Sequence, residues 1–323
     1  MAKDDTSFWA RGPGLLLIGL LTVTLGAAGG AAVLLHSVTH PPRDRNALDP
    51  ADVQVRAEEV TFQASDGVPL SGWFMAGRPR GSVILLCHDL GAARSAMLNT
   101  AVALSRNGYP LFLFDFRGHG LSGGKGSSLG IDERLDVLGA VAYLKTRRDI
   151  DSSRFGAWGI GMGAYAAALA SLEDRTIVAL ALDSLYPEVG SQLDRLVRAR
   201  IPPALHSLLP AVRLAYDPYF SFKLKRYTVT ASLNDLAARN LLFIAGADIP
   251  ERLHEQKALY ASLPDSPAAD KNLLELSASG VSGLYAGDKK KYDAALIAFF
   301  QTYLGAAARP AGKPQRPIQV IER

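Results

Sequence analysis

The chain has 323 residues, of which 48% are hydrophobic and 20% charged, enough apolar material for a large buried core. Its net charge is only +4, and no dense basic block lies outside the termini, so we expect no nucleic-acid partner. The single cysteine, Cys87, excludes an intramolecular disulfide, and no two of the six histidines are expected to pair on a helix at metal-ligand spacing, so we expect neither a metal site nor a cofactor.

The first predicted element is a helix over residues 14–37. Residues 14–35 are apolar, and no Lys, Arg, Asp or Glu occurs between Arg11 and Arg43. At ~1.5 Å per residue they span about 33 Å, enough for a hydrocarbon core of roughly 30 Å. The pattern favours an uncleaved membrane anchor, with the lipid bilayer as partner. A signal peptide cleaved among small residues 26–32 and a buried core helix are the alternatives.

The orientation of this anchor depends on flanking cations. Lys3 and Arg11 precede the apolar run, and Arg43 and Arg45 come after it, so the positive-inside count is nearly tied. An N-terminal anchor commonly exports the domain on its C-terminal side, and we therefore expect an extracytoplasmic globular domain.

From residue 53 onward, apolar strands alternate with helical segments, which predicts an α/β fold with a mostly parallel, eight-stranded sheet flanked by helices. Residues 185–236 interrupt this alternation with prolines and aromatic residues, and we expect a helical insertion over the carboxyl ends of the strands. The predicted strands are residues 53–64, 69–76, 82–87, 111–114, 154–158, 177–182, 241–245 and 272–276; the predicted helices are residues 93–107, 131–146, 162–172, 251–263 and 290–304. The predicted domain boundaries are a tail (1–13), the anchor (14–37), a linker (38–52), the globular domain (53–304) and a disordered tail (305–323).

Residues 159–163, Gly-Ile-Gly-Met-Gly, join a predicted strand to an alanine-rich helix. This is the layout of a nucleophile elbow, G-x-S-x-G, in which a strained turn presents a serine hydroxyl. Here the nucleophile position is Gly161, and no serine lies between Ser153 and Ser171. The turn can keep its shape, because glycine tolerates strained backbone, but it has no side chain with which to attack a substrate.

The order of these motifs resembles the α/β-hydrolase superfamily, in particular its membrane-anchored, serine-peptidase-like and esterase-like branch, over residues 53–304. The supporting segments are an opening hairpin (60–73), a His-Asp-Leu-Gly loop after the third strand (88–91), an Asp-Phe-Arg-Gly-His-Gly-Leu-Ser-Gly loop after the fourth strand (115–123) and the elbow.

The resemblance implies a Ser-Asp-His triad at Gly161, Asp248 and Val281. Valine cannot accept a proton, and the last histidine in the chain is His254, so nucleophile and base are both absent from their expected positions. Asp248 is either a vestigial triad acid or a helix cap.

The resemblance also implies an oxyanion-like loop formed by His88, Asp89 and Leu90 together with Met162. A carboxylate at Asp89 opposes the negative charge that such a loop stabilises. We expect His88 to pin the loop by hydrogen bonding.

The remaining candidates receive structural interpretations. Arg117 and His119 are expected to scaffold their loop, Cys87 to be an inert buried thiol and Ser184 to sit in a turn.

The sequence thus predicts a catalytically inactive, membrane-anchored α/β-hydrolase-fold protein that binds a lipid-like or peptide ligand or a membrane-protein partner. One alternative is an active ester or amide hydrolase with a rearranged site that uses Cys87, Ser184 or His88. Another is a purely structural subunit of a membrane assembly.

Overall fold

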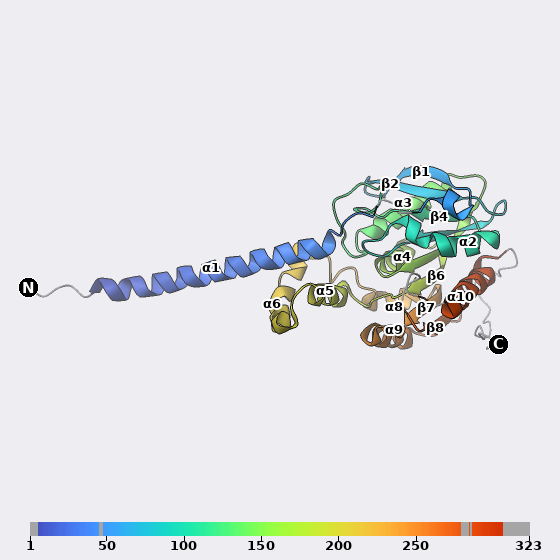
Figure 1. The fold of residues 1–323 in the computed structure, drawn as a ribbon. Helices are drawn as coiled ribbons and strands as arrows, with labels where there is room; N and C mark the ends of the chain where they lie inside the picture. Colours follow the sequence, from blue (N-terminus) through green and yellow to red (C-terminus); the bar gives the residue numbers. More distant parts are fainter. Residues whose placement is uncertain (1–5, 45–47, 279–283, 285, 306–323) are drawn as a thin grey trace, which may run out of the picture.

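The computed structural model describes residues 6–44, 48–278, 284 and 286–305, without the side chains of residues 6–21, 23 and 286. Its centre is an eight-stranded sheet of order β1-β2-β4-β3-β5-β6-β7-β8 (Figure 1). β1 and β2 form an antiparallel hairpin, β2 is antiparallel to β4, and the other pairings are parallel. The predicted mostly parallel sheet is therefore confirmed. The strands are β1 (Glu58–Gln63), β2 (Pro69–Met75), β3 (Ser82–Cys87), β4 (Leu111–Phe114), β5 (Asp151–Ile160), β6 (Ile177–Asp183), β7 (Asn240–Gly246) and β8 (Lys271–Leu276).

Helices cover both faces of this sheet. Successive side chains of a strand point to opposite faces, so Leu85 and Cys87 of β3 join one apolar core while Ile84 and Leu86 join the other. Helices α3 and α4 pack in the first core, and α2 and α10 pack in the second. The helices of the domain are α2 (Leu98–Arg106), α3 (Glu133–Lys145), α4 (Met162–Glu173), α9 (Pro250–Ser262) and α10 (Ala286–Leu304).

The segment between β6 and β7 is mostly helical. It holds α5 (Val189–Arg198), α6 (Leu209–Arg213), α7 (Tyr216–Tyr219) and α8 (Leu233–Leu236), with short 3-10 turns at Pro203–Leu208 and Thr230–Ser232.

The strand predicted from residue 53 begins instead at Glu58. The backbone N–H of Ala51 donates to Asp49 Oδ1 (2.9 Å), and that of Asp49 donates to Asp52 Oδ2 (2.8 Å). This reciprocal capping, with Pro50 in the first turn, forms a 3-10 helix over Pro50–Val53, which takes up the first residue of the predicted strand.

Helix α1 (Thr6–Thr39) projects from the globular part, and its last turns pack on the insertion (Figure 1). Leu35, Val38 and Thr39 are buried there, and the hydroxyls of Thr39 and Tyr219 are hydrogen-bonded at 2.8 Å. Within the described residues, no helix has the length and apolarity needed to cross a membrane. Residues 14–21 and 23 of the predicted anchor have side chains outside that description.

The end of α1 also corrects the expectation about histidine pairs. Because the helix continues to Thr39, the rings of His36 and His40 stack one turn apart, with centroids 3.7 Å apart. His40 Nδ1 lies 3.0 Å from Thr39 Oγ1 and 3.1 Å from the carbonyl oxygen of His36. No cluster of three or more potential metal ligands occurs among the described residues.

Candidate active site

The elbow lies between β5 and α4, where the sheet places the carboxyl ends of its central strands. Gly161 has φ +52° and ψ −111°, a conformation that side-chain-bearing residues adopt only under strain. Its N–H donates to the carbonyl oxygen of Asp183 on the neighbouring strand (2.8 Å), and Tyr165 N–H donates to the Gly161 carbonyl (3.0 Å). The turn therefore keeps the strained geometry of a nucleophile elbow although no nucleophile is present.

The Asp89 carboxylate lies directly beside this turn. Its Oδ1 accepts hydrogen bonds from the backbone N–H of Leu90 (2.7 Å) and the backbone N–H of Met162 (2.8 Å). One donor belongs to the loop after β3 and the other opens helix α4, the two places from which an oxyanion hole of this layout is built. A carboxylate of the chain itself thus occupies the two donors that a substrate oxyanion would need.

The same carboxylate fills the space of the missing nucleophile. A Cβ atom added to Gly161 would lie 2.5 Å from Asp89 Cγ and 2.7 Å from its Oδ2, well inside van der Waals contact. A side chain at position 161 and the present Asp89 conformation therefore exclude each other.

Residues 77–240, half of the chain, match the family model described as serine aminopeptidase, S33. The chain therefore belongs to the serine aminopeptidase S33 family. The matched segment contains the loop after β3 and the elbow, and it ends before Asp248 and Val281.

Two curated relatives and one solved structure are similar to this chain. The uncharacterized protein Rv2307c of Mycobacterium tuberculosis is 28% identical over 64% of this chain and 68% of its own. The α/β-hydrolase domain-containing protein WAV2 of Arabidopsis thaliana is 30% identical over 44% of this chain and 47% of its own. The Pyrococcus furiosus esterase Pf2001 superposes with a TM-score of 0.64 at 24% identity, over 83% of this chain and 98% of that one. The predicted α/β-hydrolase fold is thereby confirmed.

Competing effects on the pKa of Asp89 determine the charge at the elbow of this S33-family protein. The residue is only partly exposed, and burial of its carboxyl raises the pKa. The N–H groups of Met162 and Leu90, together with the positive charge of Arg252 on α9, act in the opposite direction. The positive charge of Arg252 lowers the pKa of both Asp89 and Asp183, and no motif in the sequence points to this residue.

Asp183 is a second carboxyl at the elbow, and it was not among the site residues predicted from the sequence. It is fully buried at the end of β6, where it accepts from the hydroxyls of Ser184 (2.8 Å) and Tyr292 (2.9 Å). Trp158 Nε1 in turn donates to the Tyr292 hydroxyl (2.8 Å). Burial raises the pKa of Asp183 to about 6, and the nearby Asp89 acts in the same direction. Its position in the sequence could have predicted this, because an acid at the end of β6, the strand beside β5, must lie next to the turn that follows β5.

His88 is brought to the site but bonds only to backbone groups. Phe116 N–H donates to Nε2 (3.0 Å), so the proton is on Nδ1, which donates to the Asp89 carbonyl (2.8 Å). The ring is fully buried, and burial lowers its pKa to about 4. This neutral imidazole joins the loops after β3 and β4 and has no ring nitrogen free to act as a base.

We expect His88 to make the fold sensitive to acid. The folded state holds it neutral to about pH 4, whereas the unfolded chain protonates it near 6.5, so its stabilising contribution is complete above 6.5 and is lost as pH falls toward 4. Relative to His88→Gln, the detergent-solubilised chain should lose about 3 kcal/mol of unfolding free energy across that interval. Chemical denaturation at several pH values measures this difference. Exposed His254→Gln is the control, and parallel profiles for the parent and His88→Gln would contradict the assignment.

The other candidate nucleophiles are buried and occupied. Cys87 ends β3 with no exposed surface, and burial raises the pKa of its thiol. Ser184 is buried, and its hydroxyl donates to the carboxylate of Asp183, which has no exposed surface of its own. Neither side chain is positioned to attack a substrate.

The expected triad acid lies in the turn after β7. Asp248 is exposed there, and the residue at the N-cap of α9 is Ile249, which makes no side-chain capping bond. The N-cap position itself therefore does not belong to Asp248, and its interpretation as a vestigial acid or as a capping residue stays a prediction. Val281, the expected base position, lies outside the described residues.

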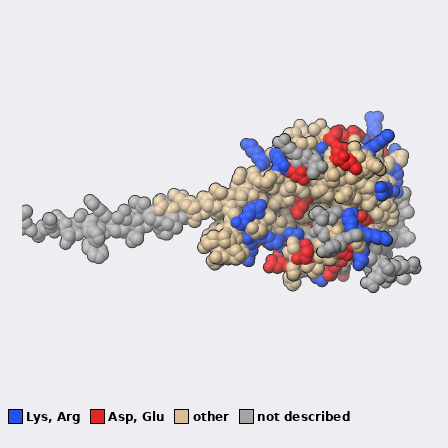
Figure 2. Space-filling view, in the orientation of Figure 1, with Lys and Arg blue, Asp and Glu red and all other residues tan. Residues whose placement is uncertain are grey.

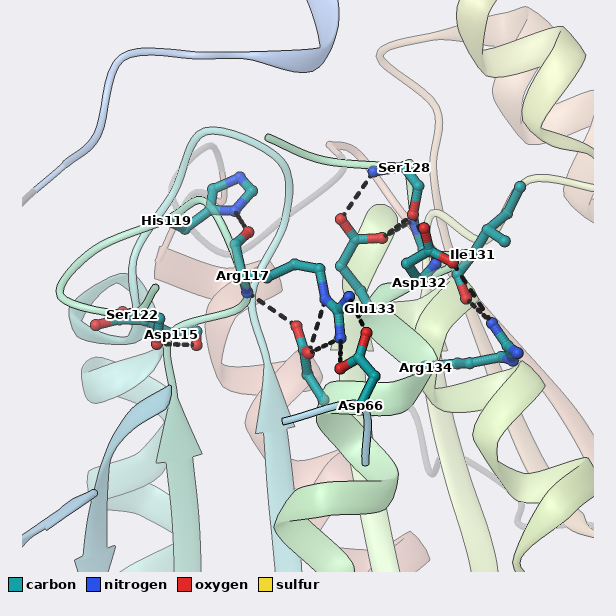
Figure 3. A network of polar contacts seen from close by, with 12 residues as sticks. Asp66, Asp115, Arg117, His119, Ser122, Ser128, Ile131, Asp132, Glu133 and Arg134 are labelled. Atoms are coloured by element: carbon teal, nitrogen blue, oxygen red, sulfur yellow. Dashed lines mark hydrogen bonds and ion pairs between the residues drawn. The ribbon is translucent and has the colours of Figure 1, made fainter. Parts of the chain in front are cut away.

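Arg117 forms the centre of an ionic network beside the site (Figure 3). Its Nη1 and Nη2 donate to the two carboxylate oxygens of Asp66 (2.8 Å each), and its Nε and Nη2 donate to Asp136 Oδ1 (2.9 and 2.6 Å). Its own N–H donates to Asp136 Oδ2 (2.8 Å), and its carbonyl lies 2.9 Å from His119 Nδ1. These bonds fix the loop after β4 against α3 and the β1–β2 turn, which is a scaffolding arrangement.

Proposed function

We propose that this protein is a non-catalytic member of the S33 family, held at a membrane by α1, which acts by binding rather than by hydrolysis. The observation that carries the proposal is the Asp89 carboxylate, which bonds both oxyanion-hole donors and fills the space of a side chain at Gly161. A substrate carbonyl would have to displace this carboxylate and would still meet no nucleophile.

The competing proposal is an active ester or amide hydrolase with a rearranged site. Its support is the similarity in fold to hydrolases such as the Pyrococcus furiosus esterase. It requires a nucleophile beside a free base. Cys87 and Ser184 are buried, and His88 uses both ring nitrogens for backbone bonds. Loss of a serine nucleophile alone costs roughly 10⁶-fold in kcat, so these contacts favour the binding role.

A cavity of about 520 Å³ in the insertion supports that role. Its size falls in the range of small-ligand sites. Its lining carries both signs of charge, with the acids Glu188, Asp194 and Asp217 and the cations Arg213 and Lys225. Of the two expected ligand classes, this mixed lining favours a peptide over a hydrocarbon chain.

Hydrolysis is tested on the full chain in mild detergent. We expect no turnover of p-nitrophenyl acetate or butyrate above that of heat-denatured protein, and no labelling by a fluorophosphonate probe, while an active esterase of this fold gives both. Turnover that co-elutes with the folded protein, or a labelled peptide from this chain, would overturn the proposal and identify the nucleophile in use.

A further inference from the structure

Exposed apolar side chains gather on one part of the insertion. Among the described residues, eight large hydrophobic side chains are exposed, and four of them lie between residues 205 and 222. Leu214 is 80% exposed and Phe222 72%, values that a soluble surface rarely gathers in one short segment. We call residues 198–226 the cap surface; its exposed apolar residues are Leu205, Leu208, Leu214 and Phe222.

The cap surface is also basic. It contains six Lys or Arg residues and a single acid, Asp217. Arg198, Arg200 and Arg226 are exposed and form no ion pair within the described part of the chain. Figure 2 shows blue side chains beside the place where α1 leaves the globular part, next to the tan insertion. Apolar side chains interspersed with unpaired cations suit a surface with an apolar interior and anionic head groups.

Helix α1 sets the distance between this surface and a membrane. Its first residue buried against the domain is Ala31, followed by Leu35, Val38 and Thr39, and the helix packs on α5 and α7 of the insertion. The uncharged run that precedes this contact is residues 12–30, about 28 Å of helix at ~1.5 Å per residue. A hydrocarbon core of roughly 30 Å uses all of that length, so no spacer remains between bilayer and domain.

We infer that the cap surface lies on the head-group region of an anionic bilayer, with Leu208, Leu214 and Phe222 inserted among the lipids. This inference rests on the membrane attachment in the proposed function. The helix brings the domain to the bilayer, and the cap surface fixes which face of the domain meets it.

Site-directed labelling of the full chain tests the contact. Phe222→Cys, Leu214→Cys and Leu208→Cys each carry an environment-sensitive fluorophore, and buried Cys87 stays unlabelled under native conditions. Asp265→Cys is the matched control, because the loop before β8 lies at the opposite, amino-terminal edge of the parallel strands. In vesicles of phosphatidylcholine with phosphatidylserine, we expect shorter-wavelength emission and quenching by brominated acyl chains at the three cap positions, and neither effect at 265.

The outcomes separate the possible failures. If the protein floats with vesicles but the cap labels respond as the control does, the docking inference is wrong and the anchor stands. If the protein does not float, the anchor and the docking inference both fail, while the binding role of the domain is untouched. Arg198→Glu with Arg226→Glu should reduce quenching at Phe222→Cys, and an unchanged signal would contradict the role of the cations.

Discussion

Gly161→Ala should destabilise the protein by roughly 3 kcal/mol or more, although it adds one methyl group. The new Cβ would collide with the Asp89 carboxylate, and alanine would have to adopt φ +52°. Strained backbone of this kind costs about 1–3 kcal/mol, and overpacking adds a similar amount. Denaturant unfolding of the parent and variant chains measures the loss.

The collision partner makes a double-mutant cycle possible. Asp89→Gly removes the carboxylate, so Gly161→Ala should cost about 1–3 kcal/mol less in the Asp89→Gly chain than in the parent. The backbone strain at position 161 is the same with and without Asp89. The cycle therefore isolates the free energy of the steric collision between the new Cβ and the Asp89 carboxylate. Additive effects of the two substitutions would show that Asp89 does not fill the space beside Gly161.

A serine at position 161 should gain nothing catalytically, even with Asp89→Gly. Clearing the oxyanion donors and adding a hydroxyl still leaves no histidine at the expected base position, because that position is Val281 and the last histidine of the chain is the exposed His254 on α9. The substituted elbow and the filled oxyanion hole are therefore two separate obstacles to hydrolysis.

The sheet and the elbow could be predicted because their signals are local. Continuous apolar runs gave β3 and β4 with the bounds that the structure has, and the glycine spacing around Gly161 placed the turn between a strand and a helix. Local signals failed where two patterns competed. The capping pair Asp49 and Asp52 forms a 3-10 helix that ends at Val53, the first residue of the predicted strand, and β1 begins only at Glu58.

The chemistry of the site depends on side-chain orientations that no local sequence pattern determines. The sequence placed Asp89 in the oxyanion-like loop, but only the fold shows that its carboxylate points at the N–H of Met162, 73 residues further on. The contact between Asp183 and Tyr292 joins residues 109 positions apart. The sequence could therefore predict that Asp89 belongs to the oxyanion-like loop, but not that its carboxylate accepts hydrogen bonds from both of the oxyanion donors.

Arg117→Ala should be the most destabilising change outside the elbow. Asp136 has no exposed side-chain surface and accepts from the Arg117 backbone N–H and guanidinium, so the substitution leaves a buried carboxylate without its cation. Breaking a buried pair in this way costs about 3–5 kcal/mol. Lys145→Ala, which removes the more exposed pair with Asp174, is the control and should cost about 0–1 kcal/mol.

Asp136→Asn in the Arg117→Ala chain distinguishes a stranded charge from lost packing. If the charge is responsible, neutralising it should recover part of the loss; if the double variant is no more stable than Arg117→Ala, the cost is one of packing. The change should also loosen the N-terminal segment, because Arg43 donates to the carbonyls of Ser122 (2.7 Å) and Gly124 (2.6 Å) on the same loop. Faster proteolysis near residue 43 in Arg117→Ala, but not in Lys145→Ala, is therefore expected, since the loop that Arg117 holds also holds the end of the N-terminal segment.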